Sequence, residues 1–208
     1  MPTTLEAEGL ARSWGERRIF SGISLRAERG VIGIAGENGS GKTTLLKILA
    51  SLLRPDSGSV RVLSGRQDLS GDARRRAVGW AGPDLAFYDE LSAAENLAFF
   101  RAAGGLPAPD SEIRERLSLV GLASAPGRAV GAFSTGMKQR LRMAFATLFD
   151  PPILLLDEPM IGLDAEGRAI VSRIIEDARR AGAVLLASND PRDFEGADQT
   201  LRLPGAAA

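Results

Sequence analysis

The segment that most constrains the fold lies near the N-terminus, at residues 36–43, and reads Gly-Glu-Asn-Gly-Ser-Gly-Lys-Thr. It follows an apolar run at 31–35 and precedes apolar residues that recur with helical spacing until Pro55. The pattern G-x-x-x-x-G-K-[ST] between a buried strand and a helix is typical of a phosphate-binding loop, or P-loop. Its glycines allow turns that direct successive amides into one concavity, and the helix adds its positive N-terminal end. The segment therefore predicts an α/β fold that binds a nucleoside triphosphate.

Two members of this loop have specific expected roles. Lys42 can reach the β- and γ-phosphates, and the Thr43 hydroxyl can bind Mg²⁺. A glycine-rich turn that matches by chance is the alternative, which the strand and helix on either side disfavour. The residues that we expect to bind the triphosphate are Gly36, Glu37, Asn38, Gly39, Ser40, Gly41, Lys42, Thr43 and Thr44.

Composition removes several kinds of chemistry. The 208 residues include neither histidine nor cysteine. This excludes Ser-His-Asp triads, thiolate nucleophiles, disulfides and metal sites built on imidazole or thiolate. The 26 basic and 26 acidic residues cancel, so no strong field attracts the chain to nucleic acid. Carboxylates, lysine, hydroxyls, backbone amides and hard metal ions remain available.

Short apolar runs alternate with helical patterns along the rest of the chain. We expect strands at 31–35, 59–63, 77–80, 153–156 and 183–187, and helices near 92–103, 110–120, 135–149 and 165–181. Apolar strands separated by helices predict a parallel sheet that is covered on both faces. The mostly helical stretch from about 84 to 150 interrupts this alternation, and we interpret it as an inserted helical lobe.

Two acids follow the apolar strand at 153–156, in the order Asp157 and Glu158. The carboxyl ends of strands in a parallel α/β sheet lie where ligands bind, so we expect Asp157 to hold Mg²⁺. Because side chains alternate along a strand, Glu158 should point the other way, where it can take a proton from an attacking water. A strand that simply ends in solvated acids is the alternative, which the P-loop in the same chain disfavours.

Together with further motifs, these residues resemble the ATP-binding subunits of ABC transporters. The segment 133–140, Phe-Ser-Thr-Gly-Met-Lys-Gln-Arg, is similar to the signature segment of that family, usually written LSGGQ. Gly-Leu-Asp at 162–164 is similar to the D-loop, and Trp14 occupies the place of the aromatic residue that stacks on adenine. The resemblance covers roughly residues 3–200, and the order of the motifs makes it specific.

The resemblance implies a P-loop NTPase core with a mostly parallel sheet, a small N-terminal antiparallel β part and the inserted helical lobe, all in one ABC ATPase domain over residues 3–203. It also implies a head-to-tail dimer in which each ATP lies between the P-loop of one subunit and the signature segment of the other. Glu158 would then be the general base. The residues that would contact the partner's ATP are Ser134, Thr135, Gly136 and Met137, with Asp164 in the D-loop.

Two positions depart from the family pattern. Asp84 is the best substitute for the glutamine of the Q-loop, and a carboxylate there can still bind Mg²⁺ or orient water. Asn189 stands where the family has its switch histidine. Its amide can donate a hydrogen bond to the γ-phosphate but cannot take up a proton.

The favoured function is an ATPase, with ATP and Mg²⁺ as cofactors, that powers a separately encoded membrane subunit. No signal peptide or apolar run of membrane-spanning length is visible, so we expect a cytoplasmic protein held at the membrane by this partner. Short subunits of this kind resemble those of haem, polysaccharide and drug exporters. The aromatic residues Phe87, Tyr88, Phe99 and Phe100 could form a groove for the partner or simply the core of the lobe.

Two alternatives stay open. The first is a regulatory module that uses ATP as a switch with little turnover, which Glu158 disfavours and the residues Asp84 and Asn189 favour. The second is an ABC-type ATPase that acts on DNA or ribosomes. Such proteins carry long coiled-coil insertions or tandem cassettes, whereas this chain has one cassette and neutral charge, so we expect no nucleic-acid partner.

Overall fold

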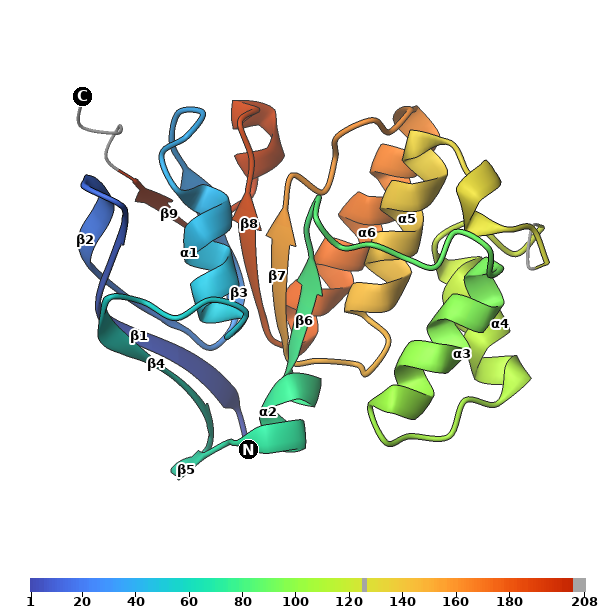
Figure 1. Cartoon of the computed structure of the whole chain (residues 1–208), viewed down its shortest axis with the longest axis horizontal. Helices are drawn as coiled ribbons and strands as arrows, with labels where there is room; N and C mark the ends of the chain where they lie inside the picture. Colours follow the sequence, from blue (N-terminus) through green and yellow to red (C-terminus); the bar gives the residue numbers. More distant parts are fainter. Residues whose placement is uncertain (125–126, 204–208) are drawn as a thin grey trace.

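A computed structural model of the chain describes residues 1–124 and 127–203, and Figure 1 shows a parallel sheet at its centre. The sheet has the strand order β6-β7-β8-β3-β9, and every neighbouring pair is parallel. Its strands are Gly30–Ala35 (β3), Val78–Ala81 (β6), Ile153–Asp157 (β7), Ala183–Ala187 (β8) and Gln199–Arg202 (β9). Strands β7 and β8 are buried along their whole length, because other elements cover both faces of the sheet.

A second, antiparallel sheet lies beside the first and has the strand order β2-β1-β4-β5. Its strands are Thr3–Trp14 (β1), Arg17–Ala27 (β2), Ser57–Ser64 (β4) and Gln67–Asp68 (β5). Irregularities in the β1–β2 register bend the long hairpin. The end of β1 that carries Trp14 therefore lies close to the P-loop.

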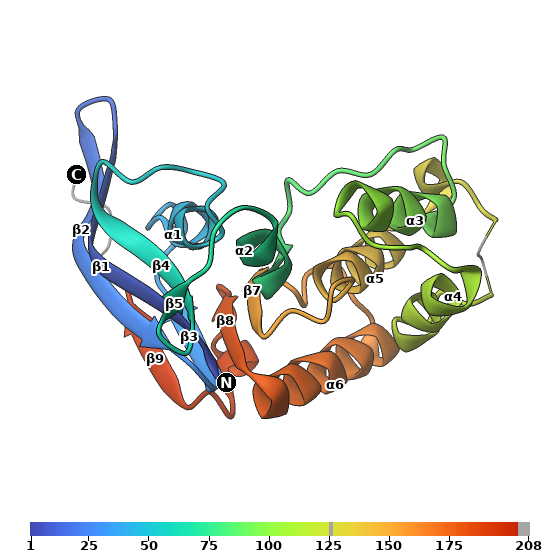
Figure 2. The same cartoon turned by 90° about the horizontal axis from the view of Figure 1, so that it is seen from below.

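The parallel sheet separates two hydrophobic cores, and each of its faces is covered in part by helices. The helices are Lys42–Leu49 (α1), Gly71–Ala77 (α2), Ala93–Ala103 (α3), Asp110–Leu119 (α4), Thr135–Ala146 (α5) and Ala165–Ala181 (α6), with 3-10 turns at Val130–Ala132 and Pro191–Phe194. Helix α1 lies between the two sheets, whereas α5 and α6 lie on the other side of the parallel sheet, with α3 and α4 beyond them (Figures 1 and 2). Strand alternation places Leu155 in the first core and Leu154 and Leu156 in the second.

The expected fold class is confirmed: a mostly parallel sheet, an N-terminal antiparallel sheet and a helical insertion between β6 and β7. Several boundaries differ from expectation. The helix predicted over 135–149 ends at Ala146, where Thr147 caps it and bonds back to the carbonyl oxygen of Met143. The strand predicted at 77–80 begins one residue later. Helix α2 and strand β9 have no counterpart in the sequence-based expectations, because both are short and mostly exposed and carry no apolar period.

Candidate nucleotide site

The predicted P-loop joins β3 to α1 and closes around the side chain of Lys42. Gly41 precedes the helix with a φ of 97°, a left-handed conformation that favours glycine, and a Cβ there would collide with β2. Lys42 is buried, and its ammonium group donates to the carbonyl oxygens of Gly36 and Glu37 at 2.7 and 3.1 Å. A third bond of 2.7 Å reaches Oδ1 of Asn189. The ammonium group therefore has a partner for each of its three hydrogens.

Two polar atoms near this loop, Ser40 Oγ and Asp157 Oδ1, are buried with no hydrogen-bond partner among the described residues. The other carboxylate oxygen of Asp157 accepts a 2.6 Å bond from the Thr43 hydroxyl. Burial raises the pKa of Asp157, whereas the Thr43 bond and the charge of Lys42 lower it. No three acidic side chains gather as a metal cluster within residues 1–124 and 127–203. Asp157 and Thr43 thus fit Mg²⁺, which binds through one or two protein oxygens and the phosphates.

Glu158 lies at the same rim as Asp157, which differs from the expectation that the two acids point apart. Strand β7 ends at Asp157, and Glu158 has a φ of 51°, so the alternation of side chains stops between them. Both carboxylates consequently line one pocket. Burial, followed by the negative charge of Asp157, raises the pKa of Glu158. A carboxylate with a raised pKa beside a phosphate site has the character of a general base.

Asn189 connects Lys42 to Glu158 through its side-chain amide. Its Oδ1 accepts from Lys42 Nζ at 2.7 Å, and its Nδ2 donates to Glu158 Oε1 at 2.6 Å. The residue follows directly on Ser188, the first residue after β8, so the neighbouring parallel strands β7 and β8 bring Glu158 and Asn189 together. The amide thus couples the P-loop lysine to the candidate base without a titratable group.

Residues that were not predicted from the sequence support Glu158 through hydrogen bonds. Ser188 Oγ lies 3.3 Å from Glu158 Oε2 and donates to Asp193 at 2.6 Å. The Asp193 carboxylate, only 4% exposed, also pairs with Arg168 of α6 at 2.7 Å. Gln139 of α5 donates to the backbone carbonyl oxygen of Glu158 at 3.2 Å. Only the position of Ser188 after an apolar strand is a sequence signal, because the other partners are far apart in the chain.

Residues of the P-loop, the two acids Asp157 and Glu158, and Asn189 line a pocket of about 360 Å³. Trp14 forms part of its wall and is 52% exposed, and Pro83 closes another side. The sequence-predicted residues that line it are Trp14, Asn38, Gly39, Gly41, Lys42, Thr43, Thr44, Asp157, Glu158 and Asn189. The structure therefore brings most of the predicted triphosphate residues, the predicted base and two of the three predicted metal residues together at one place.

Asp84, expected near Mg²⁺, has a different position. Its carboxylate forms a 2.8 Å ion pair with Lys47 of α1, and it lines a neighbouring groove, whereas its predecessor Pro83 lines the nucleotide pocket. Arg142 of α5 holds this turn by donating to the backbone carbonyl oxygens of Pro83 and Leu85 at 3.1 and 3.3 Å. Asp84 is close enough for its charge to raise the pKa of Asp157, and its role as a metal ligand stays a prediction.

The signature segment forms the exposed N-terminus of α5. Ser134 is the N-cap, and its Oγ accepts from the Met137 amide at 3.2 Å. Gly136 lies against the D-loop, where a Cβ would come within 3.0 Å of the Gly162 carbonyl oxygen. Asp164 caps α6 by accepting from the Gly167 amide at 2.7 Å. Among the described residues that line the nucleotide pocket, none belongs to the signature segment or the D-loop.

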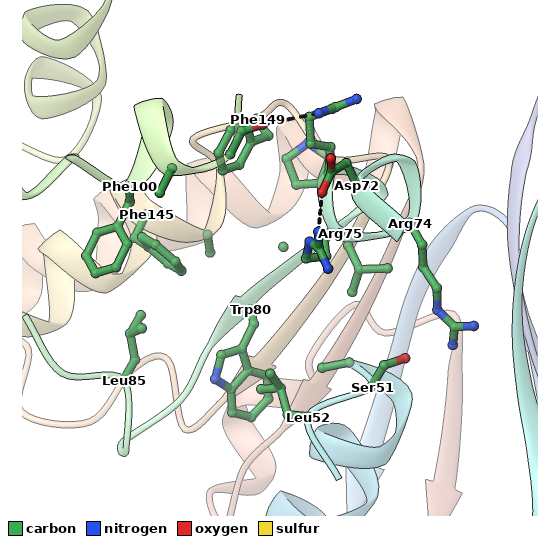
Figure 3. Close-up of a pocket in the computed structure, with 18 of the residues that line it drawn as sticks. Ser51, Leu52, Asp72, Arg74, Arg75, Trp80, Leu85, Phe100, Phe145 and Phe149 are labelled. Carbon is green, nitrogen blue, oxygen red and sulfur yellow. Dashed lines mark hydrogen bonds and ion pairs between the residues drawn. The ribbon is translucent and has the colours of Figure 1, made fainter. Parts of the chain in front are cut away.

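The neighbouring groove has a volume of about 700 Å³ and lies between α1, α2 and β6 on one side and α3 and α5 on the other (Figure 3). Phe100, Phe145 and Phe149 form one wall, Trp80 lies between the sides, and arginines of α2 form the opposite rim. Of the four aromatic residues for which a groove or the core of the lobe was considered, Phe100 alone lines the groove. The others contribute to the lobe or its surface: Phe87 packs on Phe100 and Phe145, and Tyr88 and Phe99 stay half exposed with their rings 5.2 Å apart.

Comparison with known proteins points to one family. The sequence profile described as "ABC transporter" matches residues 20–161. The daunorubicin resistance ATP-binding protein DrrA3 of Streptomyces coeruleorubidus is 34% identical over 95% of this chain and 63% of its own length. The lantibiotic transport ATP-binding protein SrtF of Streptococcus pyogenes is 34% identical over 89% of this chain and 79% of its own length.

The fold has matches among solved structures as well. The dimeric bacterial ABC transporter cassette MJ0796 superposes with a TM-score of 0.84 at 21% identity, covering 96% of this chain and 94% of that one.

The chain spans a little under two thirds of DrrA3, at 63%. Within residues 1–124 and 127–203, no helix combines the length and the apolar character that crossing a membrane requires. On the profile match and the relatives together, the chain belongs to the ATP-binding proteins of the ABC transporter family.

Proposed function

We propose that the chain hydrolyses Mg²⁺-ATP in the pocket described above and that residues 3–203 act as one ATPase domain. The observation that carries this proposal is the linked set Lys42, Asn189 and Glu158, which places a phosphate-binding cation and a general base on either side of one amide. Thr43 and Asp157 would hold Mg²⁺, which would supply positive charge to the phosphates.

In the proposed reaction, a water molecule attacks the γ-phosphorus and the bond to the ADP oxygen breaks. Glu158 accepts the proton of that water, and Lys42 exchanges its loop carbonyl partners for phosphate oxygens, where it stabilises the developing charge. The amides of the P-loop and the N-terminus of α1 hold the phosphates. One Nδ2 hydrogen of Asn189 keeps Glu158 oriented, and the second can donate to the γ-phosphate.

We further propose that the active unit is a head-to-tail pair, with a second copy or a homologous subunit. The exposed Ser134 and the Gly136 amide would bind the γ-phosphate held by the other subunit. The cassette MJ0796, which shares this fold, is dimeric, and this favours a pair. A membrane subunit would dock at the groove lined by Trp80 and Phe100 and hold the pair at the cytoplasmic face of the membrane, where hydrolysis drives transport. DrrA3 and SrtF favour drug or peptide export as the process.

The test compares Mg²⁺-ATP turnover and ATP-dependent association of the wild type with those of Glu158→Gln. The variant should lose turnover by about 100-fold or more, because the general base is gone, while it still binds ATP and associates. Glu176→Gln, which changes an exposed acid of α6, is the control and should retain full turnover. Equal inactivity of wild type and Glu158→Gln, with ATP still causing association, would favour the ATP-switched module instead.

The transport part of the proposal has its own test. Gentle extraction from membranes should co-purify an integral membrane protein with this chain, and Phe100→Glu in the groove should weaken that association while turnover of the isolated chain persists. If no integral membrane protein accompanies the wild type, the transport proposal fails and the ATPase proposal stands.

A further inference from the structure

An arginine of the same strand covers one face of the Trp14 indole. Arg12, two residues earlier on β1, places its guanidinium 4.3 Å from the ring centroid. Trp14 lines the nucleotide pocket, but Arg12 is not among the described residues that do. The guanidinium therefore covers one face of the indole, while the side chain stays 52% exposed overall. A half-covered tryptophan beside a triphosphate loop offers a flat surface to a base.

Arg12 is itself held in place. Its Nη1 donates to Asp56 Oδ1 at 2.8 Å and to the Arg54 carbonyl oxygen at 3.3 Å. The second oxygen of Asp56 accepts from the Ser13 amide at 2.7 Å, and the Asp56 amide donates to β1 at Ala11. The side chain of Arg12 is 19% exposed, so solvent weakens this ion pair less than it weakens a fully exposed one. Asp56 thus fixes both the backbone on which Trp14 stands and the guanidinium that covers it.

We propose that Arg12, clamped by Asp56, is a positioning residue for the nucleotide base. The guanidinium is attracted to the face of the indole and fixes the ring as a wall of the pocket. Adenine then stacks on a surface that is already ordered, so less conformational freedom is lost on binding. The inference rests on the proposed ATP site and adds a base-recognition device made of Arg12, Trp14 and Asp56.

The test measures dissociation constants by calorimetry, without turnover, for ATP and for inorganic tripolyphosphate, which has no base. Arg12→Met should weaken ATP binding by about 3- to 10-fold and leave tripolyphosphate binding unchanged. Asp56→Asn should shift ATP binding in the same direction by less. In a Trp14→Ala background, the Arg12→Met effect should vanish. Arg26→Met, which removes an arginine paired with Glu6 on the same sheet, is the control and should change neither constant.

Three outcomes would overturn the inference. Equal weakening of ATP and tripolyphosphate by Arg12→Met would show that Arg12 acts on the P-loop or on the fold. An unchanged ATP constant in Arg12→Met would remove its role altogether. If Trp14→Ala leaves ATP binding intact, the base lies elsewhere, although ATP binding itself stands. Failure of the wild type to bind either ligand would instead contradict the proposed function.

Discussion

Within a single chain, the P-loop side and the signature side of the proposed machinery are organised differently. On the P-loop side, Lys42, Asn189 and Glu158 touch one another although they come from three separate segments. On the signature side, the Ser134 hydroxyl bonds within its own helix turn and, among the described residues, nowhere else. One chain therefore preorganises the first half and leaves the second half with groups directed at solvent, which is the arrangement expected if a second subunit completes the site.

The strongest test of this difference is Lys42→Ala. Removing the ammonium group deletes charge-assisted bonds to the phosphates, so ATP affinity of the isolated chain should fall by about 10- to 100-fold. Equilibrium dialysis at low protein concentration measures it. Lys138→Ala is the matched control, since that lysine pairs with Asp89 in the helical lobe and should leave ATP affinity unchanged. Unchanged binding in Lys42→Ala would place the triphosphate elsewhere.

Ser134→Ala tests the signature side. ATP affinity of the isolated chain should stay the same, whereas turnover at high protein concentration should fall by about 10-fold, because the lost hydroxyl serves the partner's phosphate. Ser92→Ala removes the equivalent N-cap of α3 and should cost a similar ~1 kcal/mol of stability without loss of turnover. Weaker ATP binding by isolated Ser134→Ala would mean that both halves act within one chain.

Asp193→Asn tests whether the residues behind Glu158 belong to the preorganised half. The buried carboxylate accepts from Ser188 and Arg168, so its neutral isostere should loosen Glu158 and lower kcat by about 3- to 10-fold with little change in KM. Asp198→Asn is the matched control. Like Asp193, Asp198 accepts hydrogen bonds from an arginine and from one further donor, here a backbone amide, but it lies away from the pocket. Equal kcat in the two variants would assign Asp193 a purely structural role.

The smallest expected effect concerns pH. Burial raises the pKa of Asp157 above its ordinary value of 3.8, and such a group stabilises the fold at low pH and loses that contribution as the pH rises through the raised pKa. Without nucleotide and Mg²⁺, Asp157→Asn should therefore raise Tm at pH 7.5 more than at pH 4.5, by about 2–4 °C per kcal/mol recovered.

Asp198 provides the opposite sign, because its hydrogen bond from the Val31 amide lowers its pKa. That group stabilises the fold above its ordinary pKa, so Asp198→Asn should lower Tm at pH 7.5 and have less effect in acid. Thermal denaturation of both variants at the two pH values checks the pair. Shifts of the same sign in both variants would contradict the assignment.

The same contrast explains what the sequence could predict. The P-loop and the acidic end of β7 are local patterns, with motif, strand and helix adjacent in the chain, so Lys42 and Asp157 were predictable. The Asp193–Arg168 pair joins residues 25 positions apart and has no local pattern. The direction of Glu158 also escaped prediction, because alternation holds only while the strand continues and Glu158 has a positive φ.

The antiparallel sheet was harder to predict from the sequence. The resemblance implied it, but the register irregularities of β1 break the alternation from which a strand is normally recognised. The clamp on Trp14 depends on this sheet, since Asp56 precedes β4 and reaches back to β1. Asp56 and Asp193 lie outside any recognisable motif, and their contributions were therefore not visible in the sequence.

The placement of Trp80 has a practical consequence. The chain has two tryptophans, one at the wall of the nucleotide pocket and the other at 9% exposure in the groove between α1 and the helical lobe. Trp14→Phe leaves a protein whose intrinsic fluorescence comes from the groove alone, and Trp80→Phe leaves one that reports the pocket alone. Two single-indole proteins can therefore report separately on the nucleotide pocket and on the groove, in stopped-flow time courses and without any attached dye.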